Sequence, residues 1–376
     1  MAIEHFTFNA DLTDRFVRFG YDLYHEDAHW LPPIREELFG QLSAGFPFYR
    51  NPGNRHRHFL ATAGTRIVGR LSAFVNADLT DEDGSPVGTI GFYESVDDRV
   101  LARELLDTAI QWLRVEGRIK RIWGPMNFDI WHGYRLMTRG FGQKPFYGEP
   151  CNKPYYPALF EDYGFVPRQH WHSVEINGQE ALKNISASWA SRYQNLLGRG
   201  YRFEPFHDQS FAGELETFHA VLIRSFDAAL GFTPISPAEF KQLFAIARWA
   251  FHPDLFTFVH DEQNRLAGFA AAFLDLSEVM RAHRGQPGLL AGLRCLYRSR
   301  RCNRILFYLC GATPEEAMKG ADFGKALFYH VMHQIIKAGY ESVLIALIAR
   351  YGPMARMAGM NLPAPQRQYT LYELNP

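Results

Sequence analysis

The segment 304–350 constrains the fold most strongly, because two apolar runs enclose a glycine-bearing loop and a region of helical periodicity. The first run, 305–310, has the length and aromatic content of a buried strand. The second run, 343–348, follows Gly339, which is well placed to end a helix. Between the runs, apolar residues recur at the spacing of one helix face: Leu327, Val331, Ile335 and Ile336. Strand, loop, helix and strand predict a crossover unit that joins two parallel strands.

The first turn of the predicted helix is the chemically informative part of this unit. Its backbone N–H groups lack helical partners and lie at the positive end of the helix dipole, so they suit a diphosphate. Gly320, Ala321 and Gly324 are small enough to let such a ligand approach the backbone. The same pattern also fits a crossover unit with an ordinary glycine turn and no ligand.

Length and composition set the outer limits. A chain of 376 residues exceeds the usual size of one domain, and 47% apolar residues suffice for two cores. A formal net charge of 0 argues against a nucleic-acid-binding surface. The four cysteines lack metal-type spacing, so we expect neither a metal site nor a disulfide framework. We find no amino-terminal signal and no apolar window of about 18 residues, which predicts a cytoplasmic protein.

The order of the predicted elements repeats in the two halves. The first half reads as a hairpin (58–63 and 66–75), a strand (87–92), a helix (97–115), a strand (119–123), a short helix (155–162) and a strand (172–176). The second half reads as two helices (211–226 and 237–250), a hairpin (255–260 and 265–274), the crossover unit, a short helix (354–360) and a strand (368–374). This order predicts the α/β class with two domains, 1–178 and 179–376, each a twisted mixed sheet flanked by helices.

Several short motifs carry a resemblance to a known family. The loop with Lys319, Asp322 and Gly324 resembles the CoA loop of the GNAT superfamily of acyl-CoA N-acyltransferases, although Asp322 replaces a glycine. A carboxylate there is unfavourable beside a diphosphate unless it turns away or caps the helix. Further motifs, by their order and spacing, resemble a bacterial group of two-domain GNAT proteins: Trp30-Leu31-Pro32-Pro33, Gly124-Pro125-Met126-Asn127-Phe128, Asn152-Lys153-Pro154-Tyr155-Tyr156 and 367–373.

The resemblance implies that acyl-CoA lies between two diverging strands and that an amine attacks its thioester. A backbone N–H of the first of these strands would polarise the thioester carbonyl. In the second domain, the implied CoA-binding residues are Leu309, Gly311, Ala312, Lys319, Gly320, Ala321, Phe323, Gly324 and Lys325. The matching segment of the first domain, 95–100, has no glycine and places two acids at the helix start, where they would cap the helix and disfavour a diphosphate. We therefore expect CoA in the second domain only.

The resemblance also implies an acceptor site between the halves. Our catalytic candidates are the polar residues expected near that cleft or on the CoA strand: Asn127, His132, Glu149, Tyr308 and Cys310. The alternative roles are a structural histidine, a loop carboxylate and a buried cysteine that only fills the core. The tyrosine that often protonates the leaving thiolate in this family is replaced by Phe160 in the first half and by Ala355 in the second.

Two classes of function follow from these observations. One is an acyltransferase that moves an acetyl or longer acyl group from acyl-CoA to a primary amine, either a small molecule or a lipid, and related bacterial enzymes acylate sphingoid bases. The other is a non-catalytic acyl-CoA-binding or regulatory protein. The segment 285–303 combines leucines with arginines, which suits peripheral membrane contact, a cap over the acyl site or a helix packed on the other domain. The sequence carries no signature of an oligomeric state.

Overall fold

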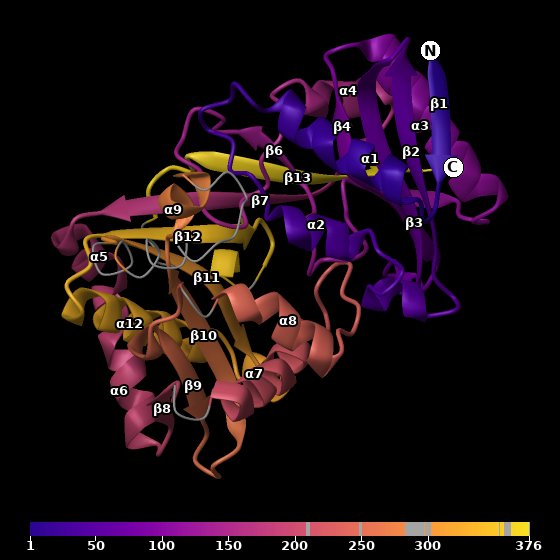
Figure 1. Cartoon of the computed structure of the whole chain (residues 1–376). Coiled ribbons are helices and arrows are strands. Elements are labelled where there is room, and N and C mark those ends of the chain that lie inside the picture. Colours follow the sequence, from indigo (N-terminus) through magenta and orange to yellow (C-terminus); the bar gives the residue numbers. More distant parts are fainter. Residues whose placement is uncertain are drawn as a thin grey trace.

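The computed structural model describes residues 1–207, 211–247, 250–282, 297, 302–352, 354–356 and 362–375. Within these ranges, one mixed sheet runs through the whole molecule (Figure 1). Its strands follow the order β1-β2-β3-β4-β5-β13-β7-β12-β11-β10-β9-β8, and β6 pairs with β13. The molecule is therefore an α/β protein, as predicted, in which both halves contribute to a single sheet.

The elements of each half largely match the predicted order. The first half contains β1 (Ala2–Phe6), α1 (Ala10–Leu23), α2 (Arg35–Gln41), β2 (Arg55–Ala63), β3 (Arg66–Thr80), β4 (Pro86–Ser95), α3 (Arg99–Val115), β5 (Arg121–Gly124), β6 (Leu136–Arg139) and α4 (Tyr156–Tyr163). The second half contains α5 (Gln179–Ser186), α6 (Ala190–Gly198), β8 (Arg202–Pro205), α7 (Phe211–Phe226), α8 (Pro237–Ala247), β9 (Phe256–His260), β10 (Leu266–Leu274), α9 (Ser277–Ala282), β11 (Arg304–Ala312), α11 (Pro314–Met318), α12 (Asp322–Lys337) and β12 (Ser342–Ala349). Of the predicted helix 354–360, the structure describes a 3-10 turn, Met354–Arg356, and residues 357–360 lie outside the described ranges.

The closing strands of the two halves are exchanged. β7 (Val166–Asn177) follows α4 in the chain, yet it pairs with β12 from Ser342↔Asn177 onward. β13 (Arg367–Leu374) ends the second half, yet it pairs with β5 of the first half through Tyr372↔Gly124 and also with β7. The predicted boundary at 178 falls directly after β7, but the strands next to it join the two halves into one hydrogen-bonded sheet.

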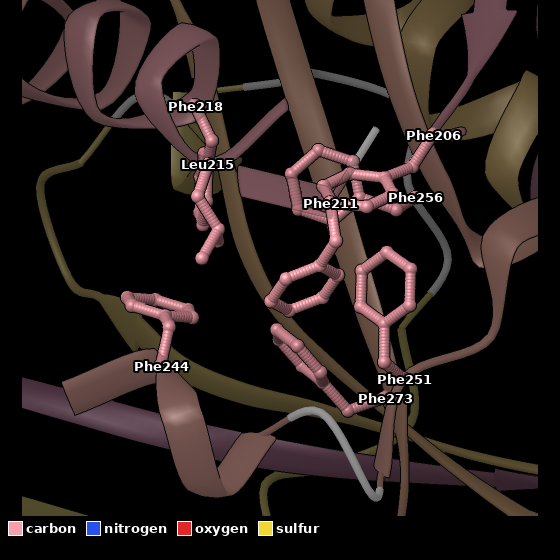
Figure 2. A pocket seen from close by; sticks show the side chains of 8 residues that line it. All are labelled: Phe206, Phe211, Leu215, Phe218, Phe244, Phe251, Phe256 and Phe273. Atoms are coloured by element: carbon pink, nitrogen blue, oxygen red, sulfur yellow. The ribbon is translucent and has the colours of Figure 1, made fainter. Parts of the chain in front are cut away.

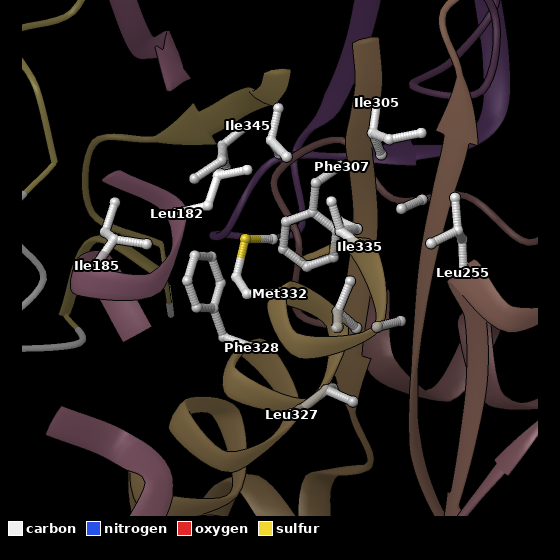
Figure 3. Packing of buried hydrophobic residues seen from close by; sticks show 14 of the residues in the cluster. Leu182, Ile185, Leu255, Ile305, Phe307, Leu327, Phe328, Met332, Ile335 and Ile345 are labelled. Atoms are coloured by element: carbon white, nitrogen blue, oxygen red, sulfur yellow. The ribbon is translucent and has the colours of Figure 1, made fainter. Parts of the chain in front are cut away.

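Helices cover both faces of the second half of the sheet. On one face, α5, α6 and α12 enclose a core in which Phe307 and Ile345 of the strands meet Met332 and Ile335 of α12 (Figure 3). Burial of each such side chain contributes roughly 1.5–3 kcal/mol. On the other face, α7 and α8 form a second core that is rich in phenylalanine. No helix within the described ranges is long and apolar enough to cross a membrane.

The end of α12 confirms the role expected for Gly339. This residue adopts a φ of +86°, a region that glycine occupies without steric cost. The Gly339 N–H donates to the Ile336 carbonyl at 3.0 Å, and the Tyr340 N–H donates to the Ile335 carbonyl at 3.2 Å. This pair of bonds is the Schellman arrangement, which satisfies carbonyl groups that the last helical turn leaves free.

Candidate functional site

The parallel strands β11 and β12 diverge at the centre of the second half. They pair only from Arg304↔Ser342 to Phe307↔Ile345, although β11 continues to Ala312 and β12 to Ala349. At the point of divergence, Tyr308 is an extra residue of β11 relative to β10, because Ala272 faces Phe307 and Ala271 faces Leu309. A bulged residue of this kind is left out of the strand ladder. Tyr308 is thus the first residue of β11 after the two strands separate.

The helix α12 begins beside this opening without a side-chain cap. Ala321 occupies the N-cap position, and no side-chain oxygen accepts a hydrogen bond there. Asp322, the residue that conflicted with a diphosphate, turns outward: its side chain is 73% exposed and lies 3.5 Å from Arg192 of α6. Gly320 has a φ of +109°, with open space where a Cβ would stand. The first turn of α12 therefore offers backbone N–H groups to an anion, with no carboxylate directed at them.

The other residues expected to bind CoA have different surroundings. The side chain of Phe323 is buried in the core against Gly268, so only its backbone can face a ligand. Lys319 donates hydrogen bonds to Glu316 and to the Tyr201 hydroxyl, and its pKa is raised by the bond to Glu316. Its charge is therefore already paired. The remaining residues of this set lie on the diverging end of β11 and in the first turn of α12: Leu309, Gly311, Ala312, Gly324 and Lys325.

The corresponding helix of the first half, α3, is closed by its own chain. Asp98 is its N-cap, and the Asp98 Oδ1 accepts hydrogen bonds from the Val100 N–H at 2.9 Å and the Leu101 N–H at 3.0 Å. This geometry confirms the expected capping by the acids of 95–100. Two of the N–H groups that a diphosphate would use are bonded to a carboxylate, which would also repel it.

The gap between β4 and β5 in the first half is filled by the loop that follows β5. β4 has its own irregularity at Phe92, whose φ is +48°, and the Asn127 Oδ1 accepts a hydrogen bond from the Phe92 N–H at 2.7 Å. The packing is so close that a Cβ on Gly91 would lie 2.6 Å from the Met126 carbonyl oxygen. Asn127, one of our catalytic candidates, therefore has a structural role in plugging this gap.

On the face opposite α12, the second half meets the loops of the first half at Tyr308. Tyr147 and Gly148 come from the first half, and a Cβ on Gly148 would lie 3.6 Å from the Tyr308 hydroxyl. Burial raises the pKa of Tyr308, whereas the charge of Arg135 lowers it. Burial also raises the pKa of Tyr147, and the negative charge of Glu37 adds to this. These groups from both halves are close enough to influence one another electrostatically.

His132 lies at the same junction, enclosed by acids from three elements. Its Nδ1 is 2.8 Å from the Asp129 Oδ1, and its Nε2 is 3.9 Å from the Glu239 Oε1 of α8. Burial alone would lower the pKa of His132, but Asp129, Glu239 and Glu37 of α2 together raise it. The Nε2 atom is buried and has no hydrogen-bond partner within the described ranges. One ring nitrogen is thus held by Asp129, while the other faces the Glu239 carboxylate without a hydrogen bond.

Two further catalytic candidates, Glu149 and Cys310, have side chains whose pKa values are raised by burial. The Glu149 side chain is 1% exposed. Its carboxylate lies 3.1 Å from the Arg367 Nε and accepts a hydrogen bond from Tyr369, and both of these residues are on β13. Burial raises the pKa of Glu149 to about 7. Cys310 packs toward the core that contains α12, and burial raises the pKa of its thiol to about 12, so it is not a thiolate at neutral pH.

A small apolar cavity lies on the α7 and α8 face. Seven phenylalanines and one leucine line it, and their rings converge from α7, α8, β9, β10 and the adjoining loops (Figure 2). Its volume is only about 10 Å³, which is room for about one water molecule. The predicted membrane-contacting segment 285–303 lies outside the described residues except for Tyr297, Cys302 and Asn303.

Sequence reasoning missed several members of the junction. Glu37, Arg135, Tyr147 and Glu239 lie on separate elements, and no motif links them. His132 was found because it lies in a polar segment directly after a strand that borders the cleft. The others become neighbours only through the exchanged sheet, which the local patterns do not encode.

Comparisons with known proteins agree with the architecture. No protein-family model matches the chain. Protein YghO of Escherichia coli (strain K12) is 26% identical over 236 residues, 61% of this chain and 57% of that protein. The bacterial ceramide synthase of Caulobacter vibrioides is 27% identical over 234 residues, 61% of this chain and 59% of that enzyme. The chain spans less than two thirds of the length of these curated relatives.

Solved structures that match the complete chain include the following two. A tandem GNAT protein from the clavulanic acid biosynthesis pathway has a TM-score of 0.52 and 13% identity, with 98% of that protein covered. A probable N-acyltransferase from Enterococcus faecalis V583 has a TM-score of 0.54 and 9% identity, with 73% of it covered. At such identities the likeness concerns the fold. The chain thus has the tandem GNAT fold, as the sequence motifs indicated.

Proposed function

We propose that the chain is an acyl-CoA-dependent N-acyltransferase whose second half holds acyl-CoA and whose acceptor amine enters between the halves. The observation that carries this proposal is the contrast between α12 and α3. The start of α12 is uncapped and borders the opening at Tyr308, whereas the start of α3 is capped by Asp98. The diphosphate of CoA would bind the first turn of α12, and the thioester would lie between β11 and β12.

The residues on the opposite face supply the chemistry for the amine. The amine nitrogen attacks the thioester carbonyl carbon, the backbone N–H at Tyr308 stabilises the developing oxyanion, and the C–S bond then breaks. In its neutral form, the His132 ring takes at Nε2, directly or through a water, the proton that the amine loses, and the surrounding carboxylates stabilise the imidazolium that results. Because the raised pKa keeps its phenol protonated, Tyr308 is the group that we assign to return a proton to the leaving thiolate. The products are an amide and free CoA.

The kind of acceptor is a further part of the proposal. The name of the Caulobacter vibrioides relative favours a lipidic amine, and the small-molecule alternative stays open. The phenylalanine cluster near α7 includes Tyr308 and Leu309 among its partly buried members, so an acyl chain leaving the thioester would meet it. The cavity there is too small for a long chain as it stands (Figure 2), so longer chains require the rings to move.

A non-catalytic acyl-CoA-binding protein is the second candidate, and one observation favours it. Phe160, which stands where many family members have the acidic tyrosine, is fully buried among the rings of Tyr93, Phe165 and Tyr372. The first half therefore has no phenol at this position. Under the binding-only hypothesis, acyl-CoA occupies α12 and no amine is acylated.

Release of free thiol from acyl-CoA separates the two candidates. Purified protein is incubated with acetyl-CoA and long-chain acyl-CoA, each with a panel of primary amines that includes a sphingoid base. An amine-dependent release supports the transferase, and tight CoA binding with no release for any amine supports the binding protein. H132N should lower kcat by about 100-fold or more without changing the affinity for CoA. The matched control is H330N, a buried histidine on α12, which should leave kcat unchanged.

A further inference from the structure

Arg135 is a buried cation at the junction of the halves. Its residue surface is 7% exposed, and its backbone adopts a φ of +72°, a conformation that non-glycine residues seldom adopt. The Arg135 N–H donates to the Pro125 carbonyl at 2.8 Å, which holds the backbone in place. The guanidinium carbon lies 3.7 Å from the centre of the Tyr134 ring and 4.4 Å from that of Trp171. The side chain is thus fixed between two aromatic rings.

The guanidinium of Arg135 has no anionic partner within the described ranges. Its Nε and Nη1 atoms are buried without a hydrogen-bond partner among the described residues, and Arg135 forms no ion pair within 4.0 Å with a carboxylate of these residues. Contact with aromatic rings stabilises a cation only in part, and a buried cation is ordinarily paired with an anion.

The position of Arg135 relates it to the acceptor rather than to the CoA diphosphate. Trp171 pairs with Ala349 at the diverging end of β12, and the charge of Arg135 acts on Tyr308 at the diverging end of β11. Tyr308 and Leu344 share the face that packs on Phe146, whereas α12 packs on the other face. Arg135 therefore borders the opening on the acceptor side.

The opposite charge gathers at the same junction. Glu37, Asp129 and Glu239 surround His132, and burial raises the pKa of Glu37 and of Glu239, which His132 in turn lowers. A ligand between the halves would meet carboxylates near His132 and an unpaired guanidinium at Arg135. An ammonium group suits the first environment, and an acidic group suits the second.

We propose that Arg135 binds an acidic group of the acceptor, so that the acceptor is an amine that also carries a carboxylate or a phosphate. The acceptor role rests on the proposed transferase function, whereas the anion site rests on the geometry of Arg135. Arginine is suited to this task because its planar guanidinium presents several donors to a carboxylate or phosphate. Stacking against Tyr134 and Trp171 fixes the plane of these donors before the ligand arrives.

Calorimetric titration with matched pairs of amines tests the proposal in the presence of CoA. The pairs are phosphoethanolamine against ethanolamine, and β-alanine against propylamine, so that a phosphate and a carboxylate are tested separately. The acidic member of at least one pair should bind about tenfold or more tightly than its neutral partner. In R135Q this preference should disappear. The control R139Q changes an exposed arginine of β6 and should keep it.

Several outcomes would overturn the proposal. These are equal binding within both pairs, no binding of either acidic amine, or a loss of CoA affinity in R135Q with the acceptor preference intact. If R135Q does not fold, a competition experiment on the wild-type protein replaces the variant. Inorganic phosphate or acetate should then displace the acidic amine. Failure of both anions to compete would also overturn the proposal. Turnover of neutral amines without preference would refute this inference alone. Acid-dependent binding without any turnover would refute the transferase alone.

Discussion

The two halves place the same elements in the same order, yet they treat the positions that bind CoA in this fold in opposite ways. In the first half, Asp98 bonds the first N–H groups of α3, and Asn127 bonds the free N–H at Phe92. In the second half, α12 has no side-chain cap, and β11 and β12 diverge at a bulge. The difference shows how a site can be closed without a change of fold, because the chain itself satisfies the groups that a ligand would otherwise satisfy.

The first half contributes to the structure of the second half. β13 connects β5 to β7, and β7 continues the sheet to β12, so the second half obtains a neighbouring strand from the first. The first half also supplies His132, Tyr147 and Arg135 to the junction. Under the proposed function, the first half would act as a scaffold and as one wall of the acceptor site.

The largest expected effect comes from giving α12 of the second half an acidic residue at its start, as α3 has in the first half. A321D places a carboxylate at the start of α12, at the position that Asp98 occupies in α3. The affinity for CoA should fall by about 100-fold or more, because the new charge both blocks and repels the diphosphate. Isothermal titration measures this. A321S, which adds a polar side chain without a charge, should lose less, and equal affinity for A321D and wild type would refute the assignment of the site to α12.

Glu149, which contacts Arg367 and Tyr369 of β13, predicts a dependence of stability on pH. Because burial raises the pKa of Glu149 above its ordinary value to about 7, the native state holds a proton that the unfolded state has already released. The contribution of Glu149 to the free energy of unfolding should therefore fall by about 3 kcal/mol as the pH rises from about 4.5 to 7. Denaturant titrations of wild type and E149Q measure it as a difference between the two proteins. A difference that rises over this range would contradict the predicted sign.

The hydrogen bond between Asn127 and Phe92 in the first half predicts a variant that loses stability but keeps its affinity for CoA. N127A removes the acceptor of the Phe92 N–H and leaves a buried donor unpaired. The free energy of unfolding should fall by about 1–3 kcal/mol. The affinity for CoA should stay as in the wild type. If N127A instead created a second CoA site, the first half would be closed only by this side chain.

The smallest effect is expected from the cap of α3. D98A removes the acceptor for the Val100 and Leu101 N–H groups and should cost about 1 kcal/mol of stability. Thermal unfolding monitored by circular dichroism detects this loss. Its CoA affinity should equal that of the wild type, which makes D98A the counterpart of A321D. A marked loss of CoA affinity in D98A would mean that the first half takes part in binding.

The sequence predicted many of the helices and strands, but it did not predict that the closing strands of the two halves are exchanged. The periodicity of 211–226 and the glycine at 339 predicted α7 and the end of α12, because these signals are local. The alternation in 367–374 suits a strand beside any neighbour, so it could not show that β13 lies between β5 and β7. Seven of the described elements were also not predicted: β1, β6, α5, α6, β8, α9 and α11. The orientation of Asp322 depends on Arg192, a contact that no spacing in the chain reveals.

The candidate site was predictable in part for the same reason. His132 and Tyr308 followed from their places next to strands, whereas Arg135 drew no attention because an arginine after a tyrosine has no signature. Its importance comes from burial between Tyr134 and Trp171 without a partner, which only the three-dimensional structure shows. Glu149 and Asn127 have polar partners within the fold, and a catalytic role for either residue stays a prediction.

A crystal structure of the protein with a non-hydrolysable acyl-CoA analogue tests the central claim most directly. The account predicts one analogue per chain, with its diphosphate on the first-turn N–H groups of α12 and its carbonyl beside the backbone of Tyr308. An analogue bound at the start of α3, or one in each half, would contradict it.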